Sequence, residues 1–107
     1  MPLRATHNLF SYGSLQDQDV QMALLGRTLK GKNETLVGYC LSEKKIYGKY
    51  PLIEPSTNKS EEIRGKLFNV SNFELHELDR YETHAYKRIQ VELKSGTKAW
   101  VYVENLG

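Results

Sequence analysis

The chain has 107 residues and a formal net charge of +2, with 39% hydrophobic and 26% charged residues. This length fits a single domain over residues 1–107, and the apolar content is enough for a folded core, which excludes wholesale disorder. No apolar stretch approaches the roughly 20 residues of a membrane helix, and Met1–Phe10 lacks the apolar core of a secretion signal. We therefore expect a cytoplasmic protein without membrane contact.

The basic residues are scattered among acidic ones rather than gathered on one segment. Lys44 and Lys45, for example, directly follow Glu43. Binding to nucleic acid usually needs a clustered basic face, often with aromatic residues between the basic ones for stacking. The charge pattern therefore predicts an ordinary solvated surface and no nucleic-acid partner.

Regular patterns in the first half predict a strand over Asn8–Tyr12, a short helix over Val20–Leu25 and a second strand over Thr35–Leu41. Gly13 ends the first strand in a tight turn. Asp17 and Asp19 are both candidate N-caps for the helix, which Gly26 ends. Ser42–Glu62 lacks a regular pattern and predicts a long connection across the surface.

The second half predicts a strand over Ile63–Val70, a helix from Ser71 to about Glu82, and a hairpin of strands Tyr86–Lys94 and Ala99–Val103. The helix starts at a capping box, in which Ser71 and Glu74 bond each other's backbone. With at least five strands and two helices, the pattern indicates an α+β domain. Its sheet is expected to curl toward a small barrel with the helices packed alongside.

Glu82 is the strongest candidate for a functional group. Leu75, Leu78 and Glu82 fall at positions i, i+3 and i+7, so the carboxylate continues the helix stripe that should face the core. Burial would raise the pKa of this carboxyl and make it a better proton acceptor, as active sites often arrange. Alternatively, the helix ends earlier and Glu82 lies on the surface, paired with Lys87 or Arg88. Spacing alone favours this alternative, because most glutamates are exposed.

The segment Tyr12–Leu15 is a second candidate, because it lies directly after a strand and ahead of a helix. A turn of this kind can aim successive backbone N–H groups at one point, which makes an anion site or an oxyanion hole without a charged side chain. Taken alone, a glycine turn at a strand end is far more often only a turn.

Together the two candidates carry a more specific resemblance. Leu9–Leu15, with the sequence LFSYGSL, resembles the opening strand and YGSL loop of the gamma-glutamylcyclotransferase-like family, which includes gamma-glutamylamine cyclotransferases. Three later segments also resemble the family, in its order: Gly65–Phe68 its third strand, Leu78–Glu82 its LDxxE motif and Tyr86–Arg88 its YxR motif. The landmarks extend over nearly the whole chain.

The resemblance implies a small mixed β-barrel flanked by helices, with the YGSL loop and the glutamate of the LDxxE motif at one cavity. It makes Glu82 the general acid/base. It implies a substrate-binding role for the loop residues Tyr12, Gly13, Ser14 and Leu15. Further substrate-binding candidates are Tyr86, as part of the cavity wall, and Arg88, which either pairs with a substrate carboxylate or braces Glu82 or Asp79.

The family reaction is intramolecular: the α-amine of a gamma-glutamyl compound attacks the side-chain carbonyl of the same molecule. It releases 5-oxoproline and a free amine or amino acid, and it needs no metal or cofactor. His7, His76 and His84 accordingly lack the spacing of metal ligands. Retention of Glu82 favours an enzyme acting on a gamma-glutamyl small molecule.

Two alternatives of another class remain open. One is a non-catalytic family member that binds a small carboxylate or amide metabolite in the same cavity. The other is a structural or interaction module whose cavity is filled by side chains, with Glu82 exposed and salt-bridged. Neither the amine half of the substrate nor the oligomeric state is predicted by the sequence.

Overall fold

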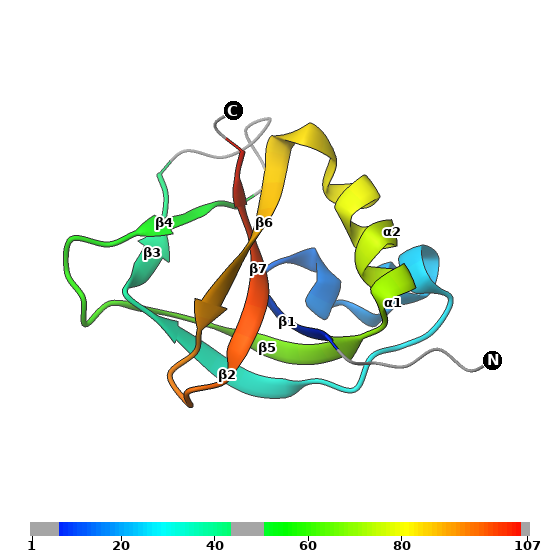
Figure 1. The fold of residues 1–107 in the computed structure, drawn as a ribbon, viewed down its shortest axis with the longest axis horizontal. Coiled ribbons are helices and arrows are strands. Elements are labelled where there is room, and N and C mark those ends of the chain that lie inside the picture. Colours follow the sequence, from blue (N-terminus) through cyan, green and yellow to red (C-terminus); the bar gives the residue numbers. More distant parts are fainter. Residues whose placement is uncertain (1–6, 44–50, 106–107) are drawn as a thin grey trace.

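The computed structural model describes residues 7–43 and 51–105, which form two sheets and two α-helices (Figure 1). In chain order the elements are β1 (His7–Ser11), the 3₁₀ turn η1 (Ser14–Gln16), α1 (Gln18–Leu25), β2 (Lys32–Val37), β3 (Tyr39–Leu41), β4 (Ile53–Pro55), β5 (Glu62–Val70), α2 (Asn72–Glu82), the 3₁₀ turn η2 (Thr83–Ala85), β6 (Tyr86–Glu92) and β7 (Lys98–Glu104). No helix in this part of the chain is long and apolar enough to span a bilayer. The two α-helices beside the sheets confirm the α+β class.

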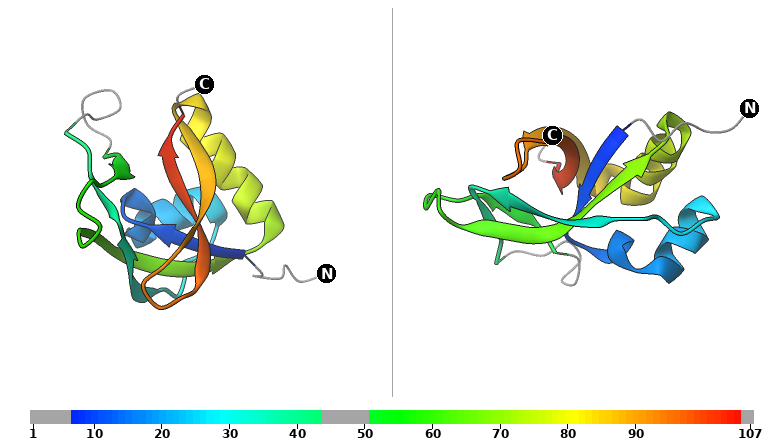
Figure 2. Two further views of the ribbon diagram at one scale, coloured as in Figure 1. Left: turned by 60° about the vertical axis from the view of Figure 1, so that its left-hand side comes forward. Right: turned by 90° about the horizontal axis from the view of Figure 1, so that it is seen from below.

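The main sheet has five strands in the order β2-β5-β1-β7-β6. It is mixed, because β1 pairs with β5 in antiparallel and with β7 in parallel orientation. The last two strands form the predicted hairpin, which crosses steeply over β5 (Figure 2). Since β1 is the central strand, the loop that follows it begins in the middle of the sheet.

The sheet is curled but does not close into the predicted barrel. In the described part of the chain β2 and β6 are its two edges, and no strand pairing joins them. The end of the β6–β7 hairpin does reach β2, where the Lys94 amide donates to the Thr35 carbonyl at 2.8 Å. After β2 the chain turns away from this sheet: Gly38 has a φ of 87°, and the following β3 pairs with β4.

Two predicted segments therefore need correction. The strand expected over Thr35–Leu41 is broken at Gly38 into β2 and β3, because a positive φ interrupts the extended backbone. The long connection expected over Ser42–Glu62 contains strand β4, and its residues 44–50 lie outside the described part of the chain.

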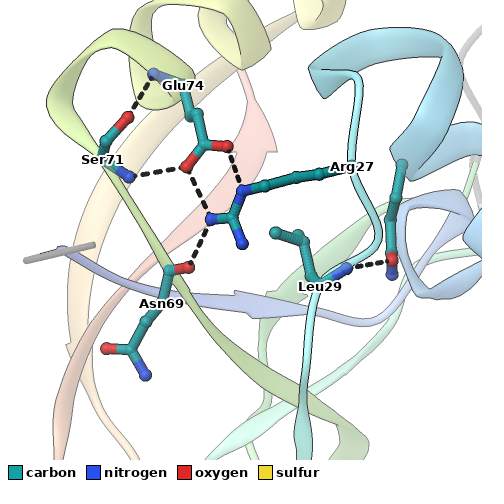
Figure 3. A network of polar contacts seen from close by, with 6 residues as sticks. Arg27, Leu29, Asn69, Ser71 and Glu74 are labelled. Atoms are coloured by element: carbon teal, nitrogen blue, oxygen red, sulfur yellow. Dashed lines mark hydrogen bonds and ion pairs between the residues drawn. The ribbon is translucent and has the colours of Figure 1, made fainter. Parts of the chain in front are cut away.

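Local hydrogen bonds explain where the two helices begin. Asp17, and not Asp19, is the N-cap of α1, since its side chain accepts from the Asp19 amide. The predicted capping box of α2 is confirmed: the Ser71 hydroxyl oxygen accepts from the Glu74 amide at 3.1 Å, and Glu74 Oε1 accepts from the Ser71 amide at 2.9 Å (Figure 3). Arg27 adds two bonds to the same carboxylate, at 2.6 and 2.8 Å, which ties the end of α1 to the start of α2.

Alternation along β1 divides the core into two clusters. Leu9 belongs to a cluster beneath the helices, which includes Leu75 and Leu78 of α2. Phe10 points to the opposite face and packs inside the curl of the sheet, together with Ile53 of β4. Both faces of β1 are therefore buried, and this packing fixes the position of the loop that follows the strand.

Candidate active site

A cavity of about 280 Å³ opens where the loop after β1, the end of α2 and the β6–β7 hairpin meet. Its wall includes most of the residues that the sequence singled out: Tyr12, Gly13, Ser14, Leu15, Glu82 and Tyr86. Tyr102 of β7, which the sequence analysis did not select, completes the aromatic part of the wall. The structure therefore brings the YGSL loop and the LDxxE glutamate to one cavity, although most of the chain separates them.

The loop is held by side chains that the sequence analysis missed. The Gly13 amide donates to the Ser11 hydroxyl oxygen at 3.3 Å. Gln21 of α1, only 1% exposed, donates to the Leu15 carbonyl at 2.7 Å and accepts from the Leu29 amide at 2.6 Å. The signal was present, because Gln21 precedes Leu24 by three positions and is a polar residue on the apolar face of a helix.

Gly13 has a φ of −125°, so the turn does not depend on the left-handed conformation that favours glycine. A Cβ atom at this position would meet nothing within 4 Å. The glycine instead leaves open space beside the cavity. The backbone amides of Ser14 and Leu15, at the start of η1, have no hydrogen-bond partner among the described residues. A bound anion or oxyanion could accept from both.

Glu82 is the last residue of α2 and is half-buried in the cavity wall. The alternative in which the helix ends early and Glu82 pairs with Lys87 or Arg88 is therefore wrong; within residues 7–43 and 51–105 this carboxyl has no ion-pair partner. Burial, and to a lesser extent the nearby charge of Asp79, raises the pKa of Glu82 to about 7. Near neutral pH such a carboxyl can both accept and return a proton.

Four described tyrosines line the cavity, namely Tyr12, Tyr81, Tyr86 and Tyr102, and three of them donate the hydroxyl hydrogen to a protein oxygen. Tyr12 donates to the Tyr102 carbonyl at 2.8 Å, Tyr86 to the Pro51 carbonyl at 3.0 Å, and Tyr102 to Asp79 Oδ1 at 2.7 Å. Burial raises the pKa of Tyr12 and of Tyr102 far above the ordinary value, so both remain neutral. The tyrosine side of the wall is consequently neutral, and the hydroxyl groups of Tyr12, Tyr86 and Tyr102 are fixed in direction.

Arg88 does not line the cavity. Its Nε donates to Asp79 Oδ1 at 2.9 Å and its Nη2 to Asp79 Oδ2 at 2.8 Å, while the guanidinium lies 4.3 Å from the centre of the Trp100 ring. Burial alone would raise the pKa of Asp79, but the hydrogen bonds from Arg88 and Tyr102 outweigh it and lower that pKa. Of the interpretations of Arg88, the geometry matches the one in which it braces Asp79.

Residues 7–43 and 51–105 contain no group of three or more His, Cys, Asp or Glu side chains that could hold a metal ion. Among the described residues of the cavity wall, Glu82 carries the charged group, and it lies in the same wall as the neutral Tyr12 and Tyr102 and the amides of Ser14 and Leu15. This combination suits proton transfer to and from a small bound molecule.

Comparison with known proteins decides the family. Residues 9–106 match the family model described as gamma-glutamyl cyclotransferase, AIG2-like. The chain belongs to this family. The matched region contains every residue of the cavity wall discussed above.

Relatives and solved structures agree with this assignment. AIG2-like protein A of Arabidopsis thaliana is 40% identical over 87 residues, which cover 79% of this chain and 50% of that protein. A solution structure from Arabidopsis thaliana has a TM-score of 0.81 and 31% identity, covering 97% of this chain and 66% of that one. A solved gamma-glutamyl cyclotransferase has a TM-score of 0.74 at 17% identity over 92% of this chain and 66% of that one, which shows a shared fold. The chain spans about half the length of AIG2-like proteins A and B.

Proposed function

We propose that this protein is an intramolecular cyclotransferase that releases 5-oxoproline and a free amine or amino acid from a gamma-glutamyl compound. The observation that carries the proposal is the position of Glu82, a half-buried carboxyl with a pKa of about 7, in the same cavity wall as the YGSL loop. Membership of the gamma-glutamyl cyclotransferase, AIG2-like family supports it.

Both reacting groups belong to one substrate molecule, so the cavity has to hold that molecule folded. Its α-ammonium group cannot attack until a base removes a proton, and Glu82 is that base. The amine nitrogen then forms a bond to the γ-carbonyl carbon, and the π electron pair moves to the carbonyl oxygen. When the carbonyl reforms, the bond to the leaving nitrogen breaks, and Glu82 returns its proton to that nitrogen. The ring nitrogen then loses its second proton to the Glu82 carboxylate, and the released amine takes up this proton and leaves as an ammonium ion.

The free amides of Ser14 and Leu15 have one of two roles in this scheme. They stabilise the oxyanion that forms on the attacked carbonyl, or they bind the α-carboxylate of the substrate. The tyrosines Tyr12, Tyr86 and Tyr102 line the same cavity, and displacement of water from it by a bound substrate would strengthen either interaction.

A substrate screen tests the proposal. The chain would be incubated with gamma-glutamyl amines, gamma-glutamyl amino acids and gamma-glutamyl-ε-lysine, and 5-oxoproline release would be measured against enzyme-free samples. Turnover of at least one class is the expected result. Binding of these compounds without any release of 5-oxoproline would overturn the proposal and identify a non-catalytic binding protein instead.

A further inference from the structure

Asp79 lies one helical turn before Glu82 on α2 and is the most heavily bonded carboxylate near the cavity. It accepts both hydrogen bonds of a bidentate pair from Arg88, at 2.9 and 2.8 Å, and a third from the Tyr102 hydroxyl at 2.7 Å. A bidentate guanidinium–carboxylate pair fixes orientation as well as distance. The last turn of α2 is therefore joined to both strands of the β6–β7 hairpin.

The partners of Asp79 are themselves fixed. Arg88 and Tyr102 are opposite each other in the β6–β7 register, and the Arg88 guanidinium lies over the Trp100 ring. The Tyr102 carbonyl in turn accepts from the Tyr12 hydroxyl at 2.8 Å. Tyr12 is the residue directly before Gly13, at the start of the loop. A continuous set of contacts thus connects the helix end, the hairpin and the loop after β1.

We propose that Asp79 is a positioning residue for Glu82, and that Arg88 controls how strongly the Asp79 charge acts on the Glu82 carboxyl. Neither Asp79 nor Arg88 lines the cavity, so both would act through Glu82 and not on a substrate. The inference rests on the proposed role of Glu82 as the acid/base.

Few other charges compete with Asp79 at this position. Within the described part of the chain, the titratable side chains that line the cavity with Glu82 are Tyr81 on α2, Tyr12 after β1, Tyr86 on β6 and Tyr102 on β7. The Asp79 charge is the electrostatic contribution that adds to burial in raising the pKa of Glu82. A carboxylate one turn away opposes ionisation of Glu82, and a guanidinium bound to that carboxylate offsets the effect.

The two partners should therefore have opposite effects. Removing the negative charge in Asp79→Asn should lower the pKa of Glu82, by about one pH unit for a charge one helical turn away in a partly solvated site. Removing the positive charge in Arg88→Met leaves the Asp79 charge uncompensated and therefore raises the pKa of Glu82. Arg88→Lys keeps the charge but loses the bidentate geometry, so the pKa of Glu82 in this variant should stay close to that of the parent.

The experiment is an NMR titration of the full chain with ¹³C-labelled glutamate side chains, from pH 4 to pH 9. The Glu82 resonance is assigned by its loss in Glu82→Gln, and Glu77→Gln serves as a control carboxyl on the same helix. Opposite shifts of the Glu82 midpoint in Asp79→Asn and Arg88→Met support the proposal. Shifts in the same direction, or no shift in Asp79→Asn, overturn it; if Arg88→Met does not fold, Asp79→Asn and Arg88→Lys decide.

This titration needs no substrate, so its outcome is independent of the substrate screen. Opposite shifts without 5-oxoproline release would retain the coupling of Asp79 to Glu82 and reject the cyclotransferase. With a turned-over substrate, the low-pH limb of kcat/KM should move with the Glu82 midpoint: downward in Asp79→Asn and upward in Arg88→Met. A purely structural role for Asp79 would lower the rate without moving that limb.

Discussion

Gln21 donates a buried hydrogen bond of 2.7 Å to the carbonyl oxygen of Leu15, and through it helix α1 holds the loop that lines the cavity. The other end of the same amide accepts from the Leu29 backbone at 2.6 Å, in the segment between α1 and β2. One side chain thus satisfies the Leu15 carbonyl of η1 and the Leu29 amide, two buried backbone groups outside the α-helices and strands.

Replacing Gln21 by Leu should lower the free energy of unfolding by about 2–4 kcal/mol, because a buried carbonyl and a buried amide both lose their partners. Urea unfolding of the parent and the variant measures the difference. Gln18→Leu, at an exposed position of the same helix, is the matched control and should change stability by no more than about 0.5 kcal/mol. A loss in Gln21→Leu as small as in the control would contradict the stabilising role of the two Gln21 hydrogen bonds.

The buried carboxylate of Glu74 depends on Arg27, which contributes two hydrogen bonds to it (Figure 3). In Arg27→Met the carboxylate stays buried without its cation, and we expect a loss of about 2 kcal/mol at pH 7. The bond from Arg27 lowers the pKa of Glu74, so this contribution is present above the ordinary pKa and is lost as the pH falls through the lowered value.

Unfolding measurements at pH 7 and at pH 3 test this pairing. The difference between the parent and Arg27→Met should be largest at pH 7 and smaller at pH 3. Arg80→Met, whose side chain is 80% exposed and pairs with Glu77, is the control and should have little effect. An equal loss in both arginine variants would show that the Glu74 pair has no special weight.

Two glycines of the site region should respond differently to a methyl group. A Cβ at Gly65 of β5 would collide with the Ser11 carbonyl oxygen and lie 2.8 Å from the Phe10 ring, so Gly65→Ala should destabilise the fold by about 1–3 kcal/mol and disturb the end of β1. Gly13→Ala meets no atom and should fold with parental stability. On a confirmed substrate it should nevertheless lose turnover, because the methyl group occupies space beside the cavity. Thermal unfolding and 5-oxoproline release, measured on both variants, would refute the contrast if the two behave alike.

Much of the fold follows from local patterns in the sequence. Alternation predicts β1, β5 and the β6–β7 hairpin, and the capping box at Ser71 places the start of α2. The apolar stripe of Leu75 and Leu78 makes Glu82 a candidate for burial, although spacing alone favoured an exposed Glu82 and only the family resemblance placed it at a cavity. These features depend on residues that are close together in the chain, and such patterns can be recognised without coordinates.

The features that the sequence did not predict depend on contacts between distant segments. The parallel pairing of β1 with β7, the open edge at β2 and the short strand β4 all result from tertiary packing. Asp79 lies within a recognised motif, but its bonds to Arg88 and Tyr102 come from the β6–β7 hairpin. A single sequence gives no register between helix and hairpin, so it could not decide whether Arg88 faces the substrate or Asp79.

Glu82 should lower the stability of the folded protein above neutral pH. Its pKa is about 7 in the fold against an ordinary value of 4.5, so the unfolded chain loses the proton first as the pH rises. The contribution is therefore absent below about pH 4.5, grows more unfavourable up to about pH 7 and is constant above, reaching at most about 3 kcal/mol. In Glu82→Gln this penalty is removed.

The unfolding free energy of Glu82→Gln relative to the parent measures this penalty. The difference should rise in favour of the variant between pH 4.5 and pH 8. Glu77→Gln, a partly exposed position of α2 outside the cavity, should show no such rise. A difference that does not depend on pH would mean that Glu82 ionises at its ordinary pKa, which would remove the electrostatic basis of the proposed proton transfer.

Glu82→Gln also provides the decisive test of catalysis, because Gln keeps the size and hydrogen-bonding ability of the side chain but cannot accept a proton. On a substrate that the parent turns over, 5-oxoproline release should fall by about 100-fold to 10,000-fold, the range typical of lost general acid–base catalysis. Substrate affinity, measured by NMR titration of the amides of Ser14 and Leu15, should change far less, since those groups are untouched. Glu77→Gln should retain the parental rate and controls for unspecific effects on α2. If Glu82→Gln turns over at a near-parental rate, Glu82 is not the proton carrier, and the cavity then acts only by holding a gamma-glutamyl chain in a folded conformation.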